Sequence, residues 1–281
     1  MRSPPQEEPI RDARPKHLFE SWHVITKAAR SARRLALFLD FDGTLTPFRK
    51  RPEQVRMSRR TRLALERLAR DPRMEICVLS GRRRADVQKR VAVRGIRCFG
   101  LHGWEGSAPA VSEARVTRLL RQARRQFRQR LADLREIWIE EKGPIFAVHV
   151  RGATAGAARR TDRIVHEVMG SFAPDLRLLP GNQVWEVTPA DMQGKGATVR
   201  ALLGRMHPVP LPLYIGDDTT DESAFAVLRR GITVCVGPRR PTGAKFALRG
   251  TQEVCRFLER LGRELRATPP RGSENSGSRG K

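Results

Sequence analysis

The sequence predicts an α/β protein in which an open parallel sheet, flanked by helices, is interrupted by a smaller α+β domain. Three observations lead to this expectation. Apolar strand-like runs alternate with helical segments between residues 35 and 99, which is the pattern of parallel strand–helix–strand units. Residues 112–187 instead follow the order helix, strand, strand, helix, strand, strand, which favours an antiparallel unit. The first alternation then resumes at residue 194.

The first strands of the parallel sheet are expected at three apolar runs, residues 35–39, 75–79 and 96–99. The helix between the first two runs has Ser58 as a candidate N-cap and ends at Asp71 and Pro72. A second helix is expected over residues 82–94. The order of these elements is βαβαβ, which implies a parallel sheet covered by helices.

The inserted unit begins with a long helix from Ser112, whose apolar residues recur every three or four positions as far as Leu134. The rest of the unit comprises strands at residues 137–140 and 145–150, joined by a loop with Gly143 and Pro144, a helix at 161–169, and strands at 176–179 and 184–187. The resulting αββαββ order predicts a compact antiparallel domain inserted into the parallel one.

The second part of the parallel domain contains helices at 195–205, 221–228 and 252–265 and strands at 213–215 and 232–236. We therefore expect the core to span residues 34–108 and 190–266, with the inserted domain at 109–189. Residues 1–33 are expected to form a basic, partly disordered arm or, around residues 19–29, a surface helix. Residues 267–281 are rich in Gly, Ser, Pro and Arg and are expected to be disordered.

Composition narrows the classes of protein that the chain can represent. It has 281 residues, 39% of them hydrophobic, and its apolar runs are too short to cross a bilayer. The first thirty residues lack the apolar stretch of a secretory signal, so a cytoplasmic protein is expected. The four cysteines are far apart in sequence and are expected to be reduced packing residues. The net charge of +25 leaves open a role with nucleic acid, but its arginines follow helices without interleaved aromatic residues, which favours a solvated surface.

Acidic or small polar residues stand where three of the predicted parallel strands end. Asp40 and Asp42 follow the first strand, Ser80 follows the second, and Asp217 and Asp218 follow the strand at 213–215. Ligands of open α/β sheets bind at the carboxyl ends of the strands, so these groups can converge. Carboxylates brought together in this way call for a hard divalent cation, and oxygen ligands without His or Cys favour Mg²⁺.

A magnesium site of this kind suits a phosphate substrate. Lys195, between two glycines at a helix start, can reach a phosphate group, and Ser80 can donate a hydroxyl from the other side. Our hypothesis is that Asp40 attacks phosphorus, Asp42 acts as general acid and base, and Asp217 holds the metal. Each group also has a structural explanation, since Ser80 or the acids at 217 and 218 can cap the helices that follow them.

These motifs resemble those of a known superfamily. Residues 40–45 (DFDGTL), 80–82 (SGR), Lys195 and residues 216–222 (GDDTTDE) are similar, in order and spacing, to the four motifs of haloacid dehalogenase phosphatases. Within that superfamily the chain resembles trehalose-6-phosphate phosphatases over roughly residues 33–262. The resemblance implies a Rossmann-like parallel core and identifies the inserted αββαββ domain as a cap.

The resemblance also implies roles for individual residues. In the core it implies a phosphorylated intermediate at Asp40, Mg²⁺ ligands from Asp40, Asp217 and the backbone carbonyl of Asp42, phosphate binding by Ser80, Gly81 and Lys195, and support of the metal site by Asp218 and Asp221. In the cap, residues 140–144 (EEKGP), 149–151 (HVR) and 185–186 (WE) resemble the family signature. By that resemblance Glu140, Lys142 and Glu186 bind hydroxyl groups of the sugar.

The expected activity is the magnesium-dependent hydrolysis of trehalose 6-phosphate to trehalose and phosphate, the last step of trehalose biosynthesis. The substrate would come from a separate synthase. Two alternatives stay open. The first is a phosphatase of another sugar phosphate, of the sucrose-phosphate or the mannosyl- or glucosyl-phosphoglycerate type. The second is a basic protein associated with nucleic acid, for which the acids at the strand ends would have no explanation.

Overall fold

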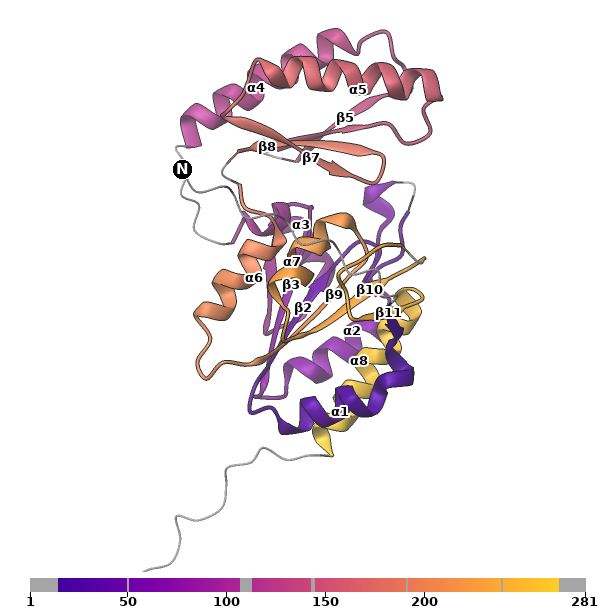
Figure 1. The fold of residues 1–281 in the computed structure, drawn as a ribbon, viewed down its shortest axis with the longest axis vertical. Helices are drawn as coiled ribbons and strands as arrows, with labels where there is room; N and C mark the ends of the chain where they lie inside the picture. Colours follow the sequence, from indigo (N-terminus) through magenta and orange to yellow (C-terminus); the bar gives the residue numbers. More distant parts are fainter. Residues whose placement is uncertain are drawn as a thin grey trace, which may run out of the picture.

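The structure is a computed structural model that describes residues 15–49, 51–106, 113–142, 145–190, 192–238 and 240–267. A core with one parallel sheet lies below a smaller domain with its own sheet (Figure 1). The core sheet has the strand order β1-β11-β10-β9-β2-β3-β4, and each neighbouring pair is parallel. Its strands are β1 (Lys16–His17), β2 (Leu35–Asp40), β3 (Met74–Leu79), β4 (Ile96–Phe99), β9 (Leu211–Gly216), β10 (Ile232–Val236) and β11 (Phe246–Leu248).

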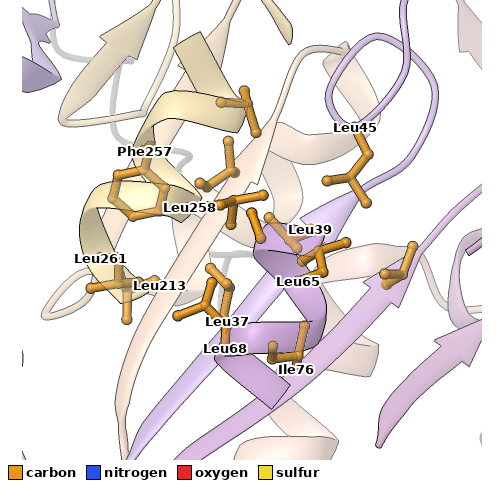
Figure 2. Close-up of a cluster of buried hydrophobic side chains, with 14 of the residues drawn as sticks. Leu37, Leu39, Leu45, Leu65, Leu68, Ile76, Leu213, Phe257, Leu258 and Leu261 are labelled. Atoms are coloured by element: carbon orange, nitrogen blue, oxygen red, sulfur yellow. The ribbon is translucent and has the colours of Figure 1, made fainter. Parts of the chain in front are cut away.

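Helices cover both faces of this sheet because the buried strands are apolar on both sides. One face packs against α1 (Trp22–Ser31), α2 (Arg59–Ala69), α3 (Arg84–Val91) and α8 (Thr251–Arg266), and the other against α6 (Lys195–Gly204) and α7 (Glu222–Val227). Figure 2 shows Leu37 and Leu39 of β2 directed towards the leucines of α2 and α8. Ala36 and Phe38 alternate with them and pack on the opposite side. Asp40 continues this second set, so its side chain belongs to the α6 face.

The inserted domain is the predicted αββαββ unit. It contains α4 (Glu113–Arg130), β5 (Trp138–Lys142), β6 (Ile145–His149), α5 (Ala155–Gly170), β7 (Leu176–Gly181) and β8 (Val184–Pro189). The strands form an antiparallel sheet of order β5-β6-β8-β7. Figure 1 shows α4 and α5 on the side of this sheet that is remote from the core. The opposite side of the sheet faces the carboxyl ends of the core strands.

The predicted fold class is confirmed, and the differences concern short or polar segments. Of the two alternatives for the N-terminal segment, residues 22–31 form a helix, and its Ile25 and Ala29 are buried in the core; residues 1–14 lie outside the described residues. The edge strands β1 and β11 were not expected, since two or three residues are too few for a periodic pattern.

Several predicted boundaries also move. The helix expected at 161–169 begins at Ala155, because Thr154 caps it by accepting a hydrogen bond from the Ala157 amide. The helix expected at 82–94 is confined to Arg84–Val91. The tail after residue 267 and the loop at 143–144 lie outside the described residues. Short helical turns complete the chain: η1 (Leu18–Ser21), η2 (Pro52–Gln54), η3 (Leu101–Gly103) and η4 (Thr219–Asp221).

The cysteines are Cys77, Cys98, Cys235 and Cys255, and all four are free and buried. Burial raises the pKa of the Cys77 thiol to about 12, so this side chain behaves as an apolar residue. The expectation of reduced packing residues is confirmed. Among the helices that the structure describes, none is long and apolar enough to cross a lipid bilayer.

Candidate active site

The candidate site lies at the carboxyl end of β2, the strand at which the order of the sheet reverses. β2 is paired with β3 on one side and with β9, which follows the inserted domain in sequence, on the other. Such a switch point leaves a crevice at the ends of the strands, where ligands of open α/β sheets bind. Asp40 is the last residue of β2 and is buried there.

Three carboxylates meet at this point. Oxygen atoms of Asp40, Asp217 and Asp221 lie within 4.8 Å of one another. The turn after β2 permits this approach, because Gly43 has a φ of +90° and an added Cβ would lie 2.0 Å from Oδ2 of Asp217. Thr44 in the same turn donates its hydroxyl to Oδ1 of Asp217 at 2.9 Å.

Lys195 of α6 hydrogen-bonds two of these carboxylates. It is the first residue of α6, and its Nζ donates to Asp40 at 2.6 Å and to Asp221 at 2.7 Å. Asp221 also accepts hydrogen bonds from the Tyr214 hydroxyl at 2.6 Å and the Asp218 amide at 2.9 Å. Asp221 thus accepts three hydrogen bonds from protein donors, more than are shown for Asp40 or Asp217.

The protonation of this cluster is controlled by burial and by like charge. Burial raises the pKa of Asp40. The charge of Lys195 lowers it, but the neighbouring Asp221 and Asp217 raise it further, so the net shift of this pKa is upward. Burial and the charge of Asp221 raise the pKa of Asp217 to about 7. Burial lowers the pKa of Lys195, but Asp221 and Asp40 outweigh it and keep the ammonium protonated. A divalent cation beside Asp40 and Asp217 would offset this repulsion, so the donor set fits an oxygen-ligated metal such as Mg²⁺.

The second aspartate of the first motif has a different environment. Both oxygens of Asp42 accept hydrogen bonds from Arg82, from Nε at 2.6 Å and from Nη2 at 2.7 Å. Arg82 also donates to Asp86 at 3.0 Å, which fixes the guanidinium. The side chain of Asp42 therefore lies outside the three-carboxylate cluster. The side chain of Asp218 also points elsewhere, because it caps η4 by accepting from the Thr219 amide at 2.7 Å.

The second motif lies at the end of β3. Ser80 is buried, and its Oγ accepts a hydrogen bond from the Arg82 amide at 3.2 Å. It does not cap the following helix, because α3 begins at Arg84 with Arg83 as its N-cap and without a side-chain cap bond. The next residue, Gly81, lies against His102, since an added Cβ would be 3.0 Å from Cε1 of that ring. A side chain at position 81 would require the ring of His102 to shift by a few tenths of an ångström.

The three cap residues share one face of the cap sheet. Glu140 and Lys142 are two positions apart on β5, and the strand register aligns Glu140 with Ala147 and Ala147 with Glu186. The small Ala147 lies between the two carboxylates in this register. Lys142 donates to Glu186 and lies 3.8 Å from Glu140.

Further partners tie this group to the core and to the rest of the cap. Glu186 accepts from Nε2 of His102 at 2.5 Å, and Glu140 bonds His149 at 2.9 Å. His149 in turn stacks on Trp138 with ring centroids 3.7 Å apart. The cap and the core are therefore in direct contact above the carboxylate cluster.

The cap carboxylates remain ionised because they have cationic neighbours. Burial raises the pKa of Glu186, but His102 and Lys142 together outweigh it and hold that pKa well below its usual range. Burial lowers the pKa of Lys142, and the charges of Glu186 and Glu140 reverse this and raise it. The site therefore offers fixed carboxylate acceptors beside an ammonium donor, a set that can bind sugar hydroxyls.

Three contributors were not recognised as functional from the sequence. Tyr214 is the single tyrosine of the chain and lies within an apolar strand, where a buried hydroxyl needs a partner. Arg82 belongs to the second motif, but its pairing with Asp42 spans 40 residues. His102 stands in a glycine-flanked turn with a φ of 58°, a conformation that is unusual for a side-chain-bearing residue.

Known proteins resemble this chain in sequence. A family model described as trehalose-phosphatase matches residues 38–252. The trehalose-phosphate phosphatase of Mycobacterium tuberculosis (strain ATCC 25618 / H37Rv) is 35% identical over 257 residues, which cover 86% of this chain and 65% of that protein. The trehalose-phosphate phosphatase of Mycobacterium leprae (strain TN) is 34% identical over 262 residues, which cover 85% of this chain and 60% of that protein. The chain thus spans less than two thirds of the length of these curated relatives.

Solved structures support the same fold. The C-terminal domain of trehalose-6-phosphate phosphatase from C. albicans has a TM-score of 0.77 and 23% identity, with coverage of 90% of this chain and 100% of that one. Trehalose-6-phosphate phosphatase from Aspergillus fumigatus (crystal form 3) has a TM-score of 0.64 and 22% identity, with the same coverage. The resemblance predicted from the motifs is confirmed, and the extent of the match to the family model shows that the chain belongs to the trehalose-phosphatase family.

Proposed function

We propose that this protein is a magnesium-dependent phosphatase that hydrolyses trehalose 6-phosphate to trehalose and inorganic phosphate. One observation carries the proposal: a buried carboxylate at the switch point of the sheet, Asp40, lies beside Lys195 and Asp217, and the cap sheet above it holds Glu186 next to Lys142. The names of the relatives supply the substrate, and the geometry supplies a reason why a phosphate and a sugar would bind together.

The chemistry begins at Asp40. An oxygen of its carboxylate attacks phosphorus, the bond from phosphorus to the sugar oxygen breaks, and an aspartyl-phosphate forms. Lys195, held by Asp221, neutralises charge at Asp40 and at the incoming phosphate. Ser80 and the backbone of Gly81 bind phosphate oxygens from the side of β3.

Asp42 is the proposed general acid and base. It protonates the leaving sugar oxygen and then takes a proton from the water that hydrolyses the aspartyl-phosphate. Both of its oxygens accept hydrogen bonds from Arg82 in this structure, and we infer that this pairing rearranges when Asp42 serves the substrate. We propose that substrate binding at the adjacent carboxylate cluster causes this change in the pairing of Asp42 with Arg82.

The metal would be held by side-chain oxygens of Asp40 and Asp217 and by the backbone carbonyl of Asp42, with Asp218 and Asp221 supporting the site. When bound, Mg²⁺ supplies positive charge that neutralises the phosphate during transfer. Asp221 contributes indirectly, because its oxygens fix Lys195 and the turn that carries Asp217.

The cap would read the sugar. Glu140, Lys142 and Glu186 present two acceptors and a donor to the hydroxyl groups of the ring that is remote from the phosphate. Contact between Glu186 and His102 places this group over the core, which would exclude water until the sugar is bound. A different sugar phosphate would present its hydroxyl groups to Glu140, Lys142 and Glu186 in a different arrangement.

A phosphate-release assay tests the proposal. Trehalose 6-phosphate, sucrose 6-phosphate and glucosyl-3-phosphoglycerate are each incubated with the full chain, with Mg²⁺ and with EDTA. We expect release from trehalose 6-phosphate to exceed the others by at least about tenfold in kcat/KM and to vanish in EDTA. Preference for another sugar would overturn the substrate, and full activity in EDTA would overturn the metal. A separate synthase as the source of the substrate stays a prediction.

A further inference from the structure

A second charged site lies on the opposite face of the core sheet from the carboxylate cluster. A surface cavity of about 590 Å³ is formed where the loop after β2 meets the first turns of α2 and α8. Leu45 and Pro47 supply the loop side, Ser58 and Thr61 the α2 side, and Thr251 the α8 side. None of the residues that build the candidate active site lines this cavity.

The lining is strongly basic. Arg49, Arg56, Arg60 and Arg256 all contribute to it, and none of the described lining residues is acidic. Arg60 is partly neutralised by Glu259, to which it donates two hydrogen bonds of 2.7 Å, and Arg256 is bound to Glu253 at 2.9 Å.

The other two arginines lack such neutralisation. Within the part of the chain that the structure describes, Arg49 and Arg56 form no ion pair with an acidic side chain, and both are exposed. They lie on the chain that leads from the catalytic strand to α2, on either side of η2. Two positive charges thus remain uncompensated at one cavity.

The N-termini of two helices add to the positive electrostatic potential at the cavity. α2 and α8 lie side by side in Figure 1. They run in the same direction, because residues from the first turns of both helices line the cavity. Near their other ends, Leu68 of α2 packs on Gly262 of α8. The positive ends of both helix dipoles therefore meet at the cavity. In the described structure the amides of Thr251 and Gln252 at the start of α8 have no protein acceptor.

Arginine groups and free helix amides select the same kind of ligand. Guanidinium groups bind phosphate in pairs of hydrogen bonds, and helix N-termini bind phosphate through backbone donors. A volume of about 590 Å³ is within the usual range for small-molecule sites and exceeds what one phosphate ion fills. We propose that this cavity is a second anion site, which binds a small phosphorylated molecule with at least two charged groups.

Titration calorimetry with inorganic pyrophosphate at fixed ionic strength tests the proposal on the full chain. Three proteins are compared: the unaltered chain, Arg49→Ala/Arg56→Ala, and Arg159→Ala/Arg163→Ala. The last pair is exposed on α5, so it removes the same charge at a distance from the cavity. We expect the cavity variant to bind pyrophosphate about tenfold or more weakly and the control to stay within about twofold of the unaltered protein.

Two results would overturn the proposal. Unchanged affinity in the cavity variant would place the bound pyrophosphate elsewhere, including the carboxylate site. Equal weakening in both double variants would mean diffuse attraction to the net charge of +25. Because the titration measures binding and not turnover, its outcome is independent of the proposed phosphatase activity.

A second measurement checks that the site is separate. Hydrolysis of p-nitrophenyl phosphate by the cavity variant should stay within about twofold of the unaltered protein, since Arg49 and Arg56 do not touch the carboxylate cluster. A large loss of this activity would place the two arginines in the active site and would contradict a second site.

Discussion

Glu186 of the cap accepts a hydrogen bond of 2.5 Å from Nε2 of His102 in the core. Both side chains are buried, and 84 residues separate them in sequence. Lys142 is the other partner of the same carboxylate. This carboxylate thus links the core to Lys142, one of the cap residues that we assign to sugar binding, and we expect its removal to affect sugar recognition more than phosphoryl chemistry.

We expect Glu186→Gln to reduce kcat/KM for trehalose 6-phosphate by about a hundredfold, because hydrogen bonds to a charged group contribute about 1.5–3 kcal/mol each. Activity towards p-nitrophenyl phosphate, which has no sugar, should change by less than about threefold. Glu141→Gln is the control, because Glu141 pairs with Arg124 and Arg128 of α4 on the far side of the cap sheet. Equal losses on both substrates would argue against a sugar-reading cap.

The nucleophile can be tested against a neighbouring acid of the same site. Asp40→Asn should lower phosphate release at saturating substrate by at least about a thousandfold, since the amide cannot attack phosphorus. Asp218→Asn should retain activity within about tenfold, because the Asp218 side chain caps η4 and an asparagine serves as a cap equally well. If Asp40→Asn released phosphate at the rate of the unaltered protein, Asp40 would not be the nucleophile.

Metal binding should depend on pH in a predictable direction. The pKa of Asp217 is raised to about 7, so in the metal-free protein the folded state binds more protons than the unfolded state between about pH 4 and pH 7. The free energy of unfolding therefore falls as pH rises through this window. Mg²⁺ competes with these protons, so its stabilising effect should be larger at pH 8 than at pH 5.

Thermal unfolding measures this effect. At a concentration of Mg²⁺ about a hundred times its Kd, binding contributes about 2.7 kcal/mol, which corresponds to a rise in Tm of about 5–10 °C for a chain of this size. Asp217→Asn should lose most of the rise at pH 8. A Tm that does not respond to Mg²⁺ at either pH would count against a metal at this cluster.

Stability away from the site should depend on Asp71 and Arg73. Arg73 donates to Asp71 at 3.0 and 2.8 Å and to the carbonyl of Leu265 at 2.6 Å, so the pair fixes the end of α8 beside the start of β3. We expect Asp71→Asn to lower the free energy of unfolding by about 1–3 kcal/mol at pH 7. Urea unfolding measures this, with Asp162→Asn on the exposed side of α5 as the control.

The pH dependence of this pair has the opposite sign to that of the metal cluster. Burial raises the pKa of Asp71, but the hydrogen bonds from Arg73 outweigh it and lower the pKa below the ordinary 3.8. A lowered pKa gives stability that is present above the unfolded value and is lost as pH falls through the folded one. The difference between the two proteins should therefore shrink below about pH 4. A constant difference down to pH 2 would contradict this assignment.

Local patterns in the sequence were sufficient for the fold class and for most elements of the core. The apolar runs that became β2, β3 and β4 were recognisable because buried parallel strands are continuously apolar, and α2 begins where Ser58 caps it. The three motifs at strand ends and Lys195 at a helix start were equally visible, because their residue types, order and spacing can be read along the chain. These signals depend on neighbours in sequence, so no tertiary information was needed.

The tertiary structure decided which of these residues face one another. Asp217, Asp218 and Asp221 are close in sequence, yet the turn η4 directs Asp218 to a cap and Asp221 to Lys195, and Asp42 is turned towards Arg82. Lys195 reaches Asp40 across 155 residues, and His102 reaches Glu186 across 84. Such orientations follow from the packing of α6 and of the cap on the sheet. A strand end specifies that a carboxylate is present, and the elements folded around it determine its partner and its charge.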